Sequence, residues 1–107
     1  MDREYNVQEW LDEKKENMVF VRYVFLPNFS NIEQFAVIYL TKEGKNWREI
    51  IKIDGNPAEA VHIHVSYSDK EKKNLHKPIT WETVEEAVDR IKSHWREYLL
   101  QHQQEGL

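Results

Sequence analysis

Two histidines one residue apart, His62 and His64, are the side chains whose type and spacing best suit chemistry. They lie in residues 61–67, where apolar and polar residues alternate as they do in a half-buried strand. Because alternate residues of a strand point to the same side, both imidazoles would lie on one face. Histidine titrates near neutral pH and exchanges protons with reacting groups. The pair therefore predicts an acid–base site on a strand.

The neighbours of the histidines depend on how this strand pairs with the strand expected at residues 47–54. Placing Ile53 and Ile63 on the same buried face sets Asp54 opposite His62 and Lys52 opposite His64, about 5 Å apart. A shift of one residue would send every side chain to the other face, so the burial pattern decides. The side chains expected together on the polar face are Arg48, Lys52, Asp54, His62, His64 and Ser66.

These residue types suit acid–base chemistry on a phosphate ester. Cleavage of RNA through its neighbouring hydroxyl needs a base, an acid and positive charge, and it needs no metal. We predict catalytic roles for His62, His64 and Asp54. Substrate-binding roles are predicted for Lys52, Arg48 and Ser66.

Two other interpretations fit the same residues. On a solvated strand face, His, Lys and Asp are ordinary cross-strand partners with no chemical role. A metal site is the second, since Asp54, Asp69 or His76 could join the two histidines as a third ligand. The spacing matches no established metal motif, so the sequence predicts no metal and no cofactor. His94 and His102 are expected to be solvated.

The elements that position these residues follow from periodicity and capping. Asn6 and Glu9 form a capping-box pattern, which predicts a short helix over residues 7–16. Strands are expected at 18–26, 34–41, 47–54 and 61–67, joined by short connections that favour an antiparallel meander. An apolar stripe predicts a long amphipathic helix over 81–101, packed on one sheet face. The predicted fold class is α+β, in a single domain of residues 1–107.

Composition narrows the class of protein. The 107 residues include 40% hydrophobic residues and no cysteine, and the formal net charge is −4. A folded domain is expected, without disulfides or a thiol nucleophile, and the negative charge disfavours binding of polyanions by the whole surface. The first residues lack the apolar core of a signal peptide, and no apolar run is long enough to span a bilayer. We expect a cytoplasmic protein with no membrane partner.

A family resemblance rests on three segments. Phe20-Val21-Arg22-Tyr23 reads as an Arg-containing first strand, residues 51–56 read IKIDGN, and residues 62–64 read HIH. With the closing helix, this order resembles the small TumE-like toxins encoded beside helix-turn-helix antitoxins, over roughly residues 18–99. Lys52 stands for the family's usual Arg, Ile53 for its aromatic residue, and Gly55 separates Asp54 from Asn56. The resemblance implies a toxin–antitoxin setting, an antitoxin protein as partner and an RNA target.

The leading hypothesis is therefore a toxin-like protein acting on RNA. The rival is a non-catalytic interaction module, in which an exposed strand or the helix expected around Trp10 binds a partner or forms a homodimer.

Overall fold

The computed structural model describes residues 4–28, 31–66 and 73–105. Six strands form one antiparallel sheet in chain order: β1 (Glu4–Trp10), β2 (Asn17–Phe25), β3 (Ile32–Glu43), β4 (Asn46–Asn56), β5 (Glu59–Val65) and β6 (Lys73–Asn74). Helix α1 (Trp81–Glu105) follows the sheet. No helix in the described ranges is both long enough and apolar enough to cross a membrane.

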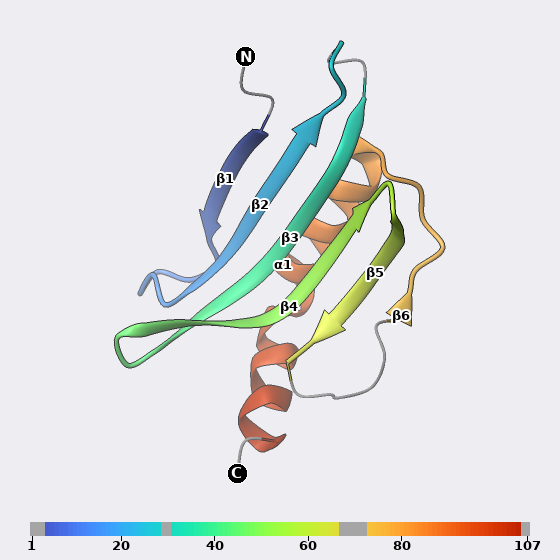
Figure 1. The fold of residues 1–107 in the computed structure, drawn as a ribbon. Helices are drawn as coiled ribbons and strands as arrows, with labels where there is room; N and C mark the ends of the chain where they lie inside the picture. The colour runs from blue at the N-terminus through green and yellow to red at the C-terminus, as the bar shows by residue number, and fades with distance from the viewer. Residues whose placement is uncertain (1–3, 29–30, 67–72, 106–107) are drawn as a thin grey trace.

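The helix covers one face of the sheet. It packs against β2, β3 and β4 and lies behind these strands in Figure 1. Its stripe of apolar residues, with Ile91 fully buried, closes a core over the inward-facing residues of the central strands. The opposite face, here called the open face, has no helix over it and is turned toward the viewer in Figure 1. The open face carries Arg22, Ala36, Lys52, Asp54, His62 and His64.

The predicted N-terminal helix over residues 7–16 is wrong, and so is the count of four strands. Residues Glu4–Trp10 form β1, which pairs with β2 along its whole length. All seven residues of β1 are exposed. Because no side of the segment is buried, its apolar residues do not follow the period of a helix or of a strand. Pairing with the free edge of β2 satisfies its backbone, a non-local effect that local capping signals do not contain. The sixth strand, β6, has only two residues.

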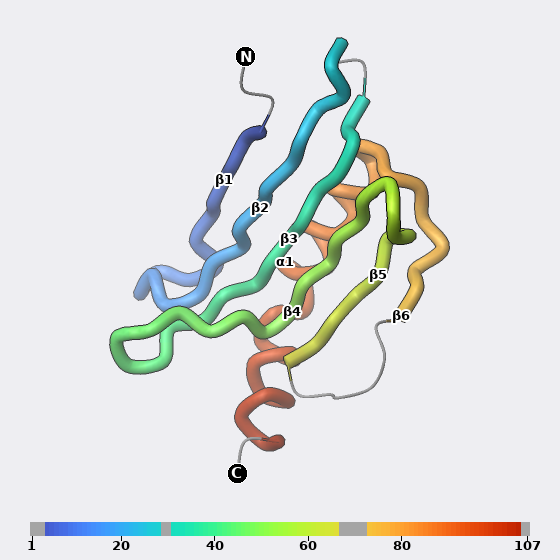
Figure 2. Tube along the Cα trace, viewed as in Figure 1, coloured from blue at the N-terminus to red at the C-terminus, as the bar shows by residue number. Residues whose placement is uncertain are grey.

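The β3–β4 hairpin changes which side chains face the helix. Leu40 pairs with Glu49 and Tyr39 pairs with Ile51, so Ile50 is an extra residue that forms a β-bulge. Beyond the bulge the alternation is reversed, and Arg48 pairs with Thr41 on the helix side. The hairpin reaches the same end of the sheet as the β1–β2 turn (Figure 2).

The predicted register of β4 and β5 is confirmed. Asp54 pairs with His62 and Lys52 pairs with His64. Strand β6 then pairs with the outer side of β5, where Asn74 lies opposite His62. His62 is therefore in an inner strand of the sheet.

Candidate functional site

Asp54 and His62 form a close buried pair at the centre of the candidate site. His62 Nε2 lies 2.9 Å from Asp54 Oδ1, and the histidine is only 5% exposed. Glu59 Oε2 lies further from the same nitrogen, at 3.6 Å. Among the described residues, neither Asp54 Oδ1 nor His62 Nε2 has an aligned hydrogen bond. Their mutual approach is therefore the main compensation for the burial of both atoms.

Both nitrogens of the His62 ring face oxygen atoms. Nδ1 lies 2.8 Å from the carbonyl oxygen of Ala60, and since a carbonyl only accepts, Nδ1 donates its proton there. The other nitrogen faces a carboxylate, which also accepts when it is ionised. His62 thus orients one oxygen of Asp54 and is itself fixed by the backbone.

Asp54 also lines a small hollow on the open face. The hollow has a volume of about 50 Å³ and is lined by Arg22, Ala36, Asp54 and Asn56, among others. Arg22, Ala36 and Asp54 stand in one row across β2, β3 and β4. Because Ala36 is small, a cationic and an anionic side chain face each other above it, about 10 Å apart at the Cα atoms.

Lys52 and His64 lie one residue pair further along the open face from Asp54 and His62. Lys52 Nζ lies 3.9 Å from Asp54 Oδ2, and Lys52 pairs across the strands with the half-buried His64. Arg22 Nε lies 3.7 Å from Glu4 Oε1, and both side chains remain about half exposed. The open face thus combines a held carboxylate, an accessible imidazole and two cations.

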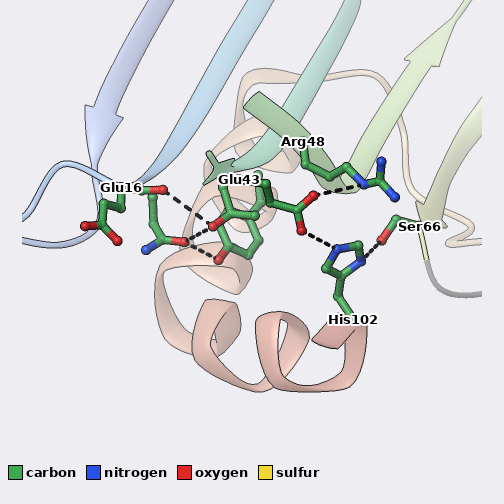
Figure 3. Close-up of polar contacts among 8 residues, drawn as sticks. Glu16, Glu43, Arg48, Ser66 and His102 are labelled. Atoms are coloured by element: carbon green, nitrogen blue, oxygen red, sulfur yellow. Dashed lines mark hydrogen bonds and ion pairs between the residues drawn. The ribbon is translucent and has the colours of Figure 1, made fainter. Parts of the chain in front are cut away.

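Arg48 and Ser66, predicted at the same site, lie in a different cluster on the helix side of the sheet (Figure 3). Arg48 Nε lies 3.4 Å from Glu43 Oε1, whose second oxygen accepts from His102 Nε2 at 3.1 Å. The other ring nitrogen of His102 lies 2.9 Å from Ser66 Oγ. The structure therefore brings together Lys52, Asp54, His62 and His64, and separates them from Arg48 and Ser66.

His102 is not the solvated bystander that the sequence predicted. Its side chain is only 11% exposed and connects the end of α1 to Glu43 and Ser66. His94 does remain half exposed, paired with Glu97 on the helix surface. The His102 contacts fix the C-terminal part of the helix against the sheet, which is a structural role.

A buried polar network lies beside this cluster in Figure 3. Asn17 Oδ1 accepts the hydroxyl hydrogens of Tyr39 at 2.6 Å and Thr41 at 2.7 Å. The Asn17 amide donates to Asp12 Oδ2 at 3.0 Å. Burial raises the pKa of Tyr39, which therefore keeps its hydroxyl proton as a donor. This network stabilises the strand ends and does not contact the hollow.

The part of the chain that the structure describes contains no set of side chains that could bind a metal ion. No three His, Asp or Glu side chains there are grouped to hold an ion. Asp69, one predicted third ligand, lies outside the described residues. His76 lies in the segment between β6 and α1, with a φ of 54°.

A family model described as Domain of unknown function (DUF7718) matches residues 2–106. The chain belongs to this family. Neither the curated proteins nor the solved structures give a match. In this DUF7718 domain, the site residues that sequence reasoning missed are Arg22 and Asn56 at the hollow. For Arg22 the signal was its row with Ala36 and Asp54 across the sheet, which requires the pairing of three strands to be known.

Proposed function

We propose that this DUF7718 domain binds RNA on the open face and cleaves it by acid–base chemistry, with Asp54 as the proton acceptor. One observation carries the proposal. The Asp54 side chain is 20% exposed on a sheet face without a helix over it, held by buried His62 and facing Arg22 across a hollow. A half-buried carboxylate costs stability unless its contacts compensate, so a carboxylate kept at such a place suggests a chemical role.

The roles of the two histidines differ in this proposal. His62 is too buried to reach a substrate, so it is a positioning residue that holds Asp54 Oδ1. The second oxygen, Asp54 Oδ2, accepts the proton of the substrate. His64 is half-buried and lies one residue pair further along the same face, about 7–8 Å away by strand geometry. It is the accessible imidazole and acts as the acid.

The reaction is an intramolecular transesterification at one phosphate of a single RNA strand. Asp54 takes the proton of the 2′-hydroxyl, and that oxygen forms a bond to phosphorus. The bond from phosphorus to the 5′-oxygen breaks, and protonated His64 gives its proton to the leaving oxygen. The products are a 2′,3′-cyclic phosphate and a 5′-hydroxyl. Arg22 and Lys52 stabilise the negative charge on the phosphate oxygens during the transfer.

The other half of the open face offers apolar surface for bases. Phe20 and Ile38 are half-buried in the row next to Arg22 and Ala36. At the end of the sheet, the rings of Trp10 and Trp47 lie 5.9 Å apart and are both exposed. Single-stranded RNA is bound largely by stacking of unpaired bases on aromatic side chains, with cations along the backbone. This arrangement supports single-stranded RNA as the substrate.

The resemblance to TumE-like toxins supports the same class of function. It falls on residues of the open face, namely Arg22, Lys52, Asp54, His62 and His64. In this proposal the protein is the toxin of a toxin–antitoxin pair, and its partner is an antitoxin protein.

A cleavage assay on a labelled single-stranded oligoribonucleotide tests the proposal. The wild type is expected to produce a cyclic phosphate end and to leave the DNA oligonucleotide of the same sequence intact, since DNA lacks the attacking hydroxyl. Asp54→Asn and His64→Ala are each expected to lower the rate at least about 100-fold, the usual contribution of a general acid or base.

Matched controls come from α1. Asp89→Asn and His94→Ala make the same chemical changes at two exposed helix positions. Both are expected to leave cleavage within about twofold of the wild type. Absence of cleavage by the wild type, or equal rates for Asp54→Asn and Asp89→Asn, contradicts the proposal.

A further inference from the structure

A large groove lies on the helix side of the sheet, away from the open face. It has a volume of about 530 Å³ and runs between β1 and the first half of α1. Its walls are mainly apolar, and three carboxylates stand around it. The lining residues used below are Val7, Tyr23, Val88, Glu9, Glu85 and Asp89.

The groove exists because the helix does not reach the edge of the sheet. Helix α1 contacts β2, β3 and β4, and no contact with β1 is comparable. Val7 of β1 is left 52% exposed, and Tyr5 and Trp81 are also exposed. Tyr23 packs against both aromatic rings, with centroids 5.8 Å from Tyr5 and 5.2 Å from Trp81. The rings of Tyr23 and Trp81 thus line the groove, with Tyr5 packed beside Tyr23, and leave apolar surface exposed in it.

One edge of β1 pairs with no other strand among the described residues. Strand β1 is the outer strand of the sheet in the described part of the chain, with β2 on one side only. An outer strand presents unpaired N–H and C=O groups that an extended peptide can pair with. Alternate side chains of such a peptide would point to the helix side, beside Tyr5 and Val7, and enter the groove.

We propose that a partner protein adds an extended segment to β1, with apolar side chains in the groove and lysine or arginine at its ends. The carboxylates at the rim of the groove, Glu9, Glu85 and Asp89, favour a segment with positive charge. Glu9 is paired with Lys92 at 2.8 Å, but Glu85 and Asp89 add two further carboxylates. Lysine side chains at the ends of the segment reach these carboxylates, and the long aliphatic stems cover apolar surface.

A second copy of this chain fits the rim less well. Antiparallel pairing of two β1 strands about Val7 places Glu9 of one copy opposite Tyr5 of the other. That arrangement brings a further carboxylate to a rim that already holds Glu85 and Asp89. Like charges side by side oppose association, so the basic segment is the favoured occupant.

Binding of a synthetic peptide tests the proposal. The probe is the capped heptapeptide Lys-Thr-Val-Thr-Val-Thr-Lys, which places two valines and two terminal lysines on the same face when it is extended. Titration into ¹⁵N-labelled full chain is expected to shift the β1 amides and the indole N–H signal of Trp81, with a Kd below about 1 mM. The same peptide with glutamates in place of lysines is expected to bind at least about tenfold more weakly.

Two substitutions on β1 provide a matched pair. Val7→Lys puts a charge into the apolar groove, where it repels the lysines of the peptide and displaces its valines, and is expected to weaken binding at least about tenfold. Asn6→Lys puts the same charge on the opposite face of the same strand and is expected to leave binding unchanged. Circular dichroism verifies that both variants fold.

Three outcomes overturn the proposal. The first is a lack of peptide binding, and the second is equal binding of the lysine and glutamate peptides. The third is self-association through β1 without peptide, seen as a dimer by light scattering with shifts confined to the β1 amides. That result would assign the groove to a second copy of the chain.

Discussion

His62 Nε2 lies 2.9 Å from Asp54 Oδ1 across the β4–β5 ladder, and both atoms are buried. Each atom depends on the other, because removal of one leaves a buried polar group without compensation. The pair therefore links the stability of the sheet to the position of the proposed catalytic carboxylate.

This dependence predicts strong coupling between the two positions. Asp54→Ala and His62→Ala are each expected to lower the free energy of unfolding by about 1–3 kcal/mol. The double variant is expected to lose less than the sum, with a coupling energy of at least about 0.5 kcal/mol. Urea unfolding at one fixed pH measures all three values. Additive losses would show that the two side chains do not stabilise each other.

Gly55, next to Asp54, predicts a second effect on stability. A Cβ at this position would lie 2.8 Å from Val61 Cγ2 and 3.3 Å from Ile79 Cγ1, so β4 approaches β5 too closely for alanine. Gly55→Ala is expected to destabilise the protein by about 1–3 kcal/mol through overpacking. Gly44 is the control, since nothing lies near its Cβ position and only its φ of 64° opposes alanine, at a cost of about 1 kcal/mol. Thermal unfolding of both variants measures the two losses, and Gly55→Ala is expected to lose more stability than Gly44→Ala. An equal loss would contradict the prediction.

The sequence contained enough to predict the β4–β5 part of the site. Burial of Ile51, Ile53 and Ile63 on the helix side leaves one register, and that register sets Asp54 opposite His62. The burial of His62 itself was not predictable in this way. It depends on β6, whose two residues carry no strand pattern, and on the cover that Asp54 and Glu59 provide.

Arg48 shows why the rest of the site was missed. Counting in steps of two from Asp54 and Lys52 places Arg48 on the open face. The β-bulge at Ile50 inserts one residue and sends Arg48 to the helix side, where Glu43 binds it. A bulge has no sequence signal as clear as a glycine turn, so alternation alone could not reveal it. The N-terminal strand was missed for the related reason that its pairing with β2 is not local.

Asp12 predicts an acid-dependent loss of stability. Partial burial acts to raise the pKa of Asp12, but hydrogen bonds from the Asn17 side chain and the N–H groups of Asn17 and Glu16 outweigh it. The pKa in the folded protein is therefore below its ordinary value. A depressed pKa stabilises the fold fully above the unfolded value of about 3.9 and less as the pH falls through the folded value.

The variant Asp12→Asn tests this dependence because its side chain does not titrate. It is expected to be less stable than the wild type by no more than about 1 kcal/mol near pH 6, since the site is close to solvent. The difference is expected to shrink as the pH is lowered below about 4. Chemical denaturation at a series of pH values follows it. A difference that stays constant down to pH 2 would show that Asp12 is not responsible.

The central claim is that RNA lies on the open face over Asp54, and mapping of the bound RNA tests it most directly. A 2′-O-methyl oligoribonucleotide lacks the attacking hydroxyl, so its complex persists during an NMR titration of the ¹⁵N-labelled chain. The amides of Arg22, Ala36, Asp54 and His64 are expected to shift, together with the indole signals of Trp10 and Trp47. Shifts confined to α1 or to the groove beside β1, or no shifts at millimolar RNA, would contradict the claim.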